Sequence, residues 1–203
     1  MRLMIAAMIF LIGLGGAGSV KAESVRAGWD VGVKAYASGD YATALRKWGP
    51  LAEQGYSSAQ YNLGQMYRMG QGVLQDYKVA VRWYRVAAEQ GNSDAQFALG
   101  RIYFGGQGVL QDYKEVMRWY RKAAEQGHAV AQSGLGAIYS RGTAVPQDSV
   151  LGHMWSNIAG ANGNKVGADN RAVIEKIMTP AQITEAQKLA KECMNSNYKN
   201  CGR

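Results

Sequence analysis

The chain contains very few of the residues that build metal centres and disulfide scaffolds. Its 203 residues include two cysteines and two histidines, and none has the C-x-x-C or H-E-x-x-H spacing of a zinc site. Proline occurs only three times, which argues against a loop-rich chain. Hydrophobic residues make up 47% and charged residues 19%, so a folded core is expected and a disordered chain is excluded.

Long hydrophobic runs are absent except near the N-terminus. Residues 3–14 are apolar, but this run is shorter than the roughly 20 residues that span a bilayer. Arg2 precedes it, and Val20 and Ala22 follow at positions that a signal peptidase reads. We therefore predict a cleaved signal peptide over residues 1–22 and a periplasmic or secreted mature chain without a membrane span. A membrane anchor is the alternative.

Acidic residues are outnumbered by basic ones, 15 against 23. Without Arg2 and Lys21 the mature chain would keep 21 basic residues and a net charge of +6. No basic helix with interleaved aromatic residues is present, so we expect no nucleic-acid partner. The charge favours anionic proteins, peptides, cell-wall polymers or lipid headgroups as partners.

Glycine, in contrast, is over-represented and periodic. It accounts for 26 residues, about 13% against a usual share of about 7%. Glycines recur every 36 residues at positions 55, 91, 127 and 163, and residues 59–94 and 95–130 are identical at 23 of 36 positions. Self-similarity at a fixed period of this length indicates a solenoid.

Each repeat unit has the pattern of two helices. Ala59, Leu63 and Tyr67 form one helical stripe, Asp76 is placed to cap the next helix, and Gly91 is placed to end it. The second stripe consists of Tyr77, Ala80, Tyr84 and Ala87. Neither helix can bury its apolar face alone, so stacked units must supply the stability. The predicted fold is all-α, a right-handed α-solenoid of helical hairpins.

Two further sets of residues recur with the same period of 36 residues. Gly64, Gly100 and Gly136 fall inside the first helices, where glycine costs about 1 kcal/mol relative to alanine. A close helix–helix crossing would offset that cost. The tryptophans at positions 83, 119 and 155 have the helical spacing of core residues, and we predict packing for them in preference to ligand stacking.

The segment AQYNLGQMYRMGQGVLQDYKVAVRWYRVAAEQGNSD resembles the Sel-one-like repeat, a longer relative of the tetratricopeptide repeat. The resemblance covers residues 40–163 and implies a paired-helix scaffold that assembles other proteins. The expected parts are a degenerate hairpin at 23–58, full repeats at 59–94, 95–130 and 131–166, and a C-terminal capping hairpin at 167–203.

Cys193 and Cys201 align with the end of one helix and the start of the next. An exported chain meets conditions that permit disulfides, and their separation of eight resembles the inter-helix bridges of cysteine-rich members of this family. We predict a disulfide, worth about 2.5 kcal/mol by loop entropy, that pins the last turn against a further helical stub. Two free thiols or a redox pair are the alternatives.

Catalytic patterns are weak. Cysteine-rich relatives are linked with penicillin binding and hydrolysis, and Ser196 and Lys199 fit the S-x-x-K motif of such enzymes. No K-T-G or S-D-N element accompanies the motif, so we treat the match as chance. His128 and His153 lack partners at metal-ligand spacing and are interpreted as surface or packing residues. The expectation is no catalytic residue, no metal and no cofactor.

Positions that differ between repeat copies offer a better candidate for a binding site, because they cannot serve the shared stacking in the same way. On the first helices these are Tyr61/Phe97/Ser133, Gln65/Arg101/Ala137 and Arg68/Phe104/Ser140. In tetratricopeptide-like solenoids the corresponding positions face the concave groove. The candidate ligand-binding residues are Tyr61, Gln65, Arg68, Phe97, Arg101 and Phe104. Tolerated surface variation is the alternative, and Arg46, Arg82 and Arg118 are interpreted as a solvated outer ridge.

The leading hypothesis is a non-enzymatic exported scaffold that binds a protein or peptide in this groove, where Arg68 and Arg101 favour an acidic ligand. A weak penicillin-binding or β-lactamase-like hydrolase is the enzymatic alternative, by analogy with the cysteine-rich relatives. A purely structural envelope protein, with no dedicated ligand, is a third class.

Overall fold

The computed structural model describes residues 16–199 and residue 201, and all regular structure in that part of the chain is helical. Its ten helices are α1 (Gly16–Ala37), α2 (Tyr41–Glu53), α3 (Ser57–Met69), α4 (Tyr77–Glu89), α5 (Ser93–Gly105), α6 (Tyr113–Ala124), α7 (Ala129–Arg141), α8 (Ser149–Ala161), α9 (Lys165–Glu175) and α10 (Pro180–Asn195). The predicted all-α class is confirmed.

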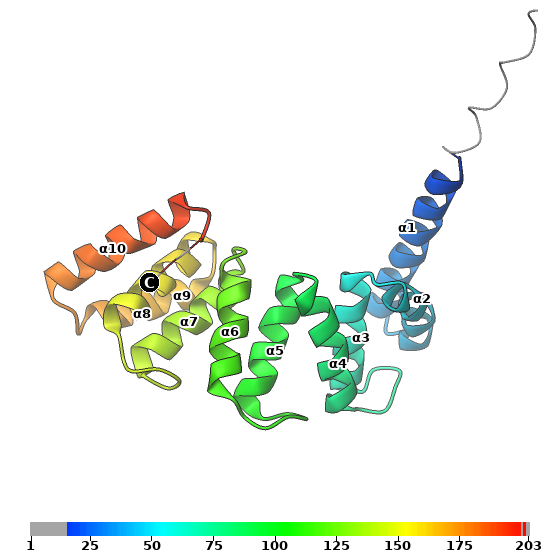
Figure 1. Ribbon diagram of the computed structural model, residues 1–203, viewed down its shortest axis with the longest axis horizontal. Coiled ribbons are helices and arrows are strands. Elements are labelled where there is room, and N and C mark those ends of the chain that lie inside the picture. Colours follow the sequence, from blue (N-terminus) through cyan, green and yellow to red (C-terminus); the bar gives the residue numbers. More distant parts are fainter. Residues whose placement is uncertain (1–15, 200, 202–203) are drawn as a thin grey trace, which may run out of the picture.

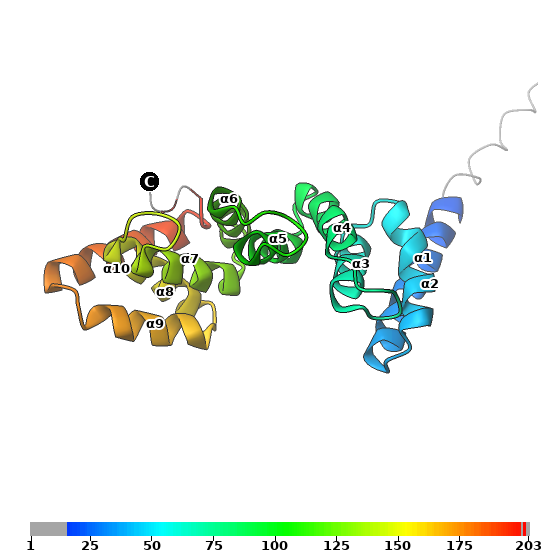
Figure 2. The same ribbon diagram turned by 90° about the horizontal axis from the view of Figure 1, so that it is seen from below.

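The helices are stacked in chain order along an elongated, curved body (Figure 1). Helices α3 and α4, α5 and α6, and α7 and α8 pack as pairs, and the second helix of each pair contacts the first helix of the next. A quarter turn of the view shows the same succession from α1 to α8, with α9 and α10 alongside α7 and α8 (Figure 2). Because helices contact mainly their chain neighbours, the fold is the predicted solenoid of helical hairpins.

The two ends depart from the regular stack. At the N-terminus, α1 begins at Gly16, before residue 23, where the degenerate hairpin was expected to start, and most of the predicted signal peptide lies outside the described residues. At the C-terminus, α9 and α10 both pack against α8 and barely contact each other, so this pair is more open than the expected capping hairpin. None of the helices among the described residues combines the length and apolarity needed to cross a membrane.

The helix boundaries follow from capping residues that recur in each unit. The carboxylates of Asp76, Asp112 and Asp148 accept hydrogen bonds from backbone N–H groups in the first turns of α4, α6 and α8. The first helices end at glycines in the left-handed region, for example Gly70 at φ 69°. The predicted cap at Asp76 is confirmed, and Gly91, at φ 93°, has the left-handed backbone expected where α4 ends.

The in-phase glycines inside the first helices lie at close crossings, as predicted. A Cβ placed on Gly64 would lie 2.6 Å from the Tyr84 ring, and one on Gly100 would lie 2.3 Å from the Tyr120 ring. In the third unit Ser156 replaces the tyrosine and the helices approach more closely, so a Cβ on Gly136 would lie 3.0 Å from the Ser156 backbone nitrogen. Each glycine therefore admits a neighbouring helix.

The core divides into two clusters along the solenoid. One is centred on Trp48 and joins α1, α2 and α3, while the larger one runs from α4 to α8 and includes both cysteines. Trp119 and Trp155 are buried and Trp83 is half-buried, which confirms that the periodic tryptophans pack in the interior.

A ladder of buried amides links successive units. Gln60, Gln96 and Gln132 each donate from Nε2 to a backbone oxygen near the end of the preceding helix, at 3.0 Å. Each also accepts a hydrogen bond through Oε1, from Gln90, Gln126 and Asn162 respectively, at 2.7–2.8 Å. These buried amides are therefore hydrogen-bonded at both ends, and the ladder fixes the spacing between units.

The C-terminal segment is closed by the predicted disulfide between Cys193 and Cys201. Cys201 lies in a turn, so the expected start of a further helix is not found there. Inside the loop Tyr198 has a left-handed backbone, with φ 64°, and its hydroxyl donates to Asn162 Oδ1 at 3.0 Å. The disulfide loop therefore attaches the chain end to the last rung of the amide ladder.

Candidate functional site

A cleft of about 470 Å³ lies over the first helices of two successive units, and all six predicted binding residues line it. Tyr61, Gln65 and Arg68 form one stripe on α3. Phe97, Arg101 and Phe104 form the matching stripe on α5. The spacing of three and four residues places each set on a single helix face, and stacking brings the two faces together.

The α3 side of the cleft is a hydrogen-bonded network. Gln65 donates to the Tyr61 hydroxyl at 3.0 Å, and its Oε1 accepts from the Tyr84 hydroxyl at 3.0 Å and from Arg68 at 3.0–3.2 Å. Burial raises the pKa of Tyr61 and of Tyr84 above the usual value of 10.0. Both phenols are therefore neutral hydrogen-bonding groups at physiological pH, and Gln65 holds the Arg68 guanidinium in place.

The α5 side of the cleft is aromatic. Phe97 stacks on Tyr120, with ring centroids 5.3 Å apart, and on His128, with centroids 4.9 Å apart. Phe104 packs edge-on against Tyr113 and remains 43% exposed. The exposed part of the Phe104 ring and the half-buried Phe97 ring offer apolar contact area to a ligand.

The Arg101 guanidinium is the most available charge in the cleft. The side chain is exposed, and it forms no hydrogen bond or ion pair within the part of the chain that the structure describes. An exposed guanidinium beside aromatic rings suits a carboxylate ligand, which it can bind through two parallel N–H groups.

The sequence analysis missed Asp94, Tyr120 and His128, which also line the cleft. Asp94 lies one turn before Phe97, at a position that also varies between copies, as Ser58 and Val130 show. Extending the comparison of copies by one turn would have found it. Tyr120 holds the place of Tyr84 in the stripe of the second helix, which was expected to pack against neighbouring units, and that stripe gives no sign that the side chain also reaches the cleft.

Other candidate features contribute no site. The Ser196 hydroxyl lies 2.9 Å from the Cys193 carbonyl oxygen and 2.8 Å from that of Lys199, at the C-terminal end of α10, so it is engaged by the backbone. His153 is buried with Nε2 2.8 Å from Glu175, as a packing residue of α8. No metal-binding group of three His, Cys, Asp or Glu side chains occurs within the described residues.

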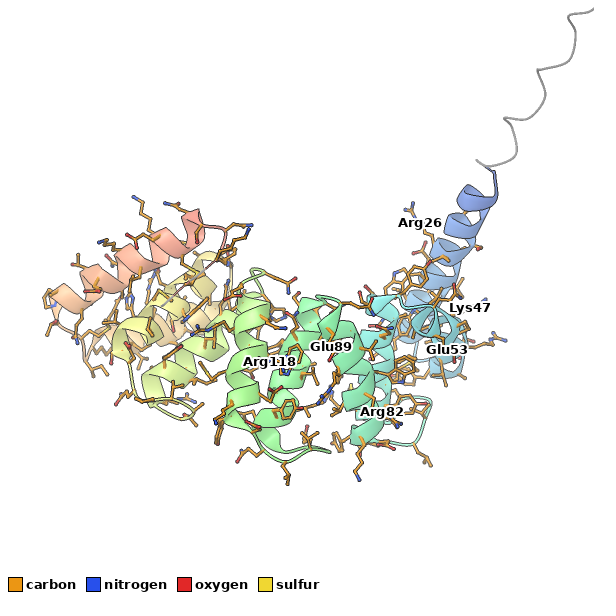
Figure 3. All side chains as sticks on the ribbon, viewed as in Figure 1. Arg26, Lys47, Glu53, Arg82, Glu89 and Arg118 are labelled. Atoms are coloured by element: carbon orange, nitrogen blue, oxygen red, sulfur yellow. A yellow bond between two sulfur atoms is a disulfide. The ribbon has the colours of Figure 1, made fainter. Side chains whose placement is uncertain are left out.

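The expected arginine ridge is exposed on the second helices of the first units. Figure 3 labels two of its members, Arg82 of α4 and Arg118 of α6. Arg118 pairs with Glu115 at 3.2 Å and lies 4.7 Å from the Trp119 ring centroid. Its guanidinium is therefore partly committed to its own helix.

The fold defines a helical-repeat protein with a cleft over the first helices of two units. A family model for the Sel1 repeat matches residues 57–92, 93–128 and 129–164, just over half of the chain. Each matched unit begins at the first residue of α3, α5 or α7, two residues before the boundaries expected from the sequence. The chain belongs to the Sel1 repeat family.

Solved structures agree with this family. The chain is 37% identical to c5321, a protective antigen of uropathogenic Escherichia coli strains with an SLR fold, with a TM-score of 0.71 over 77% of this chain. It spans only 34% of that protein. A Sel1 repeat protein from Oxalobacter formigenes is 38% identical, with a TM-score of 0.59 over 64% of this chain and 97% of its own.

No curated protein matches the chain significantly. Sel1 repeat proteins generally act as non-catalytic scaffolds that mediate protein–protein interactions. Nothing in these comparisons supports the hydrolase alternative.

Proposed function

We propose that the chain is an exported, non-enzymatic scaffold that binds a peptide segment of another protein in the cleft between α3 and α5. The observation that carries the proposal is the convergence on one cleft of all six side chains chosen because they vary between otherwise similar repeat copies. Export rests on the N-terminal sequence of residues 1–22, whose basic start and apolar run are typical of a signal peptide.

The chemistry of the cleft supports a peptide as ligand. Phe97, Phe104 and Tyr61 offer aromatic contact area, and Arg68 and Arg101 offer guanidinium groups for acidic groups of the ligand. A cleft volume of about 470 Å³ lies within the range of sites that enclose small ligands or a few residues of a chain.

The proposal is tested by panning a phage-displayed peptide library on the folded chain and measuring the selected peptides by fluorescence anisotropy. The Phe97→Ala/Arg101→Ala variant should keep its helical circular dichroism, since neither side chain belongs to the buried stacking set. Its peptide affinity should fall by more than tenfold, and that of the wild type should fall with added salt as charges are screened.

The matched control is Glu89→Ala/Arg82→Ala, which removes one acidic and one basic side chain from exposed positions on α4 that do not line the cleft. This control should bind as the wild type does. Peptides that bind the Phe97→Ala/Arg101→Ala variant as tightly as the wild type would show that the cleft is not the binding site.

A further inference from the structure

We infer that the cleft selects a ligand with two opposite charges, and that the fitting ligand is an extended peptide segment with the order basic–x–aromatic–x–acidic, in either chain direction. The basic side chain would pair with Asp94, the aromatic one would lie on Phe97, and the acidic one would pair with Arg101. This inference rests on the proposed function and adds the chemistry of the ligand.

The first observation is a single stripe along α5. Asp94, Phe97, Arg101 and Phe104 are spaced by three, four and three residues, and all four line the cleft. Seven residues separate Asp94 from Arg101, which corresponds to about 10.5 Å along a helix axis. The stripe therefore presents a carboxylate and a guanidinium at two separate points, with an aromatic ring between them.

The second observation is that the negative charge of Asp94 is not cancelled by a cation. Its nearest partner is His128, whose Nε2 lies 3.3 Å from Asp94 Oδ1. His128 Nδ1 accepts the Ala131 backbone N–H as the cap of α7, at 3.1 Å. Nδ1 uses its lone pair on that N–H, so His128 faces Asp94 through Nε2. The Asp94 side chain has no lysine or arginine partner among the described residues and is 60% exposed to a ligand.

The third observation is that the positive charges at the other end are also uncompensated. Arg101 has no partner among the described residues, and the guanidinium of Arg68 is held by the neutral amide of Gln65. Among the residues that the structure describes, Asp94 is the only acidic one that lines the cleft. A ligand with acidic groups at both ends would place one of them against Asp94, and like charges in contact are unfavourable.

The dimensions match an extended chain. Side chains on one face of a strand are about 6.7 Å apart, so the first and fifth residues of a segment lie about 13 Å apart with the third between them. Flexible basic and acidic side chains can lean inward to meet groups about 10.5 Å apart along α5. The third side chain then lies over the exposed aromatic surface of Phe97 and its neighbours.

The experiment uses three blocked, fluorescently labelled pentapeptides, Lys-Ser-Phe-Ser-Glu, Glu-Ser-Phe-Ser-Glu and Lys-Ser-Phe-Ser-Lys. Their affinities are compared for the wild type, Asp94→Lys and Glu89→Lys. The last variant is the matched control, because it makes the same change of charge at an exposed position on α4 that does not line the cleft (Figure 3).

The wild type and Glu89→Lys should bind the mixed-charge peptide at least tenfold more tightly than the other two. Asp94→Lys should reverse this order and bind the diacidic peptide at least tenfold more tightly than the mixed one. If Asp94→Lys keeps the wild-type order of affinities, or loses affinity equally for all three peptides, the inference is overturned and the proposed function is unaffected. If none of the pentapeptides binds while library peptides still require Phe97 and Arg101, the charge order is likewise wrong. Failure of both assays would overturn both proposals.

Discussion

At the scale of single residues, glycine has opposite consequences at different places in the helices. Gly100 lies inside α5, where a methyl group would meet Tyr120 ring carbons at 2.3 and 2.5 Å. Gly28 lies inside α1 with no atom within 4 Å of the corresponding position. The helical cost of glycine is therefore offset by packing at Gly100 and by no such contact at Gly28.

This difference predicts opposite effects of one substitution. Gly28→Ala should raise the free energy of unfolding by up to about 1 kcal/mol, because alanine is the better helix former. Gly100→Ala should lower it by about 1–3 kcal/mol, because the added methyl overpacks the crossing. Urea denaturation of both variants measures these changes. Equal stabilisation by both substitutions would show that α5 and α6 do not approach as described.

The buried tyrosines predict the behaviour of the chain in alkali. Burial raises the pKa of Tyr61, Tyr84 and Tyr120, so these phenols stay neutral in the folded chain at pH values where they would ionise after unfolding. Their stabilising contribution is complete below about pH 10 and is lost as the pH rises from there through the raised folded pKa values.

Ultraviolet absorbance of tyrosinate should therefore show late-ionising tyrosines in the folded protein, and denaturant unfolding should show declining stability above about pH 10. Tyr84→Phe should remove one late-ionising group from the absorbance titration. Tyrosines that all ionise together near the ordinary value would contradict the burial of these rings.

At the scale of elements, the sequence predicted most of the helical architecture because the same local signals recur in each unit. Asp76 and Gly91 determine helix ends through their own backbone neighbours, so a single unit is enough to place them. The departures lie at the chain ends, where no second copy exists for comparison. The open arrangement of α9 and α10 depends on how both helices meet α8, and neither helix sequence contains that information.

The cleft illustrates the same limit. Variation between copies identified Phe97 and Arg101, because a side chain outside the shared packing set is free to differ. It did not identify Tyr120. This side chain packs in the core and also lines the cleft, and the sequence pattern indicates only the packing role. His128 was interpreted as a surface or packing residue, and its ring contact with Phe97 depends on how the start of α7 meets α5.

The amide ladder was also missed, since a glutamine on a helix is normally a surface residue. It gives a prediction for one element interface. Gln96→Leu should lower the free energy of unfolding by about 1–3 kcal/mol, because the Ala88 carbonyl and the Gln126 amide lose their buried partner. Gln187→Leu, at an exposed position on α10, should change it far less. If chemical denaturation shows similar changes in the free energy of unfolding for Gln96→Leu and Gln187→Leu, the ladder adds no stability.

At the scale of the whole molecule, the two core clusters indicate how the solenoid loses its structure. Contacts run mainly between neighbouring helices, so stability is a sum of local units and the interfaces between them. The cluster around Trp48 ends with α3, the cluster around Trp155 begins with α4, and the two meet where α3 packs against α4. A destabilising substitution at one end of the solenoid should therefore increase local unfolding mostly in the helices at that end.

Hydrogen exchange followed by mass spectrometry can test this directly. Trp48→Ala removes a buried ring at a cost of about 3–5 kcal/mol and should speed exchange in α1, α2 and α3 while α7 and α8 stay close to wild type. Trp155→Ala should do the reverse, because its ring is buried in the other cluster. Each variant serves as the other's control. If both substitutions speed exchange equally over all ten helices, the molecule unfolds as one cooperative unit, and the cleft between α3 and α5 would then be as sensitive to damage in α8 as to damage in α2.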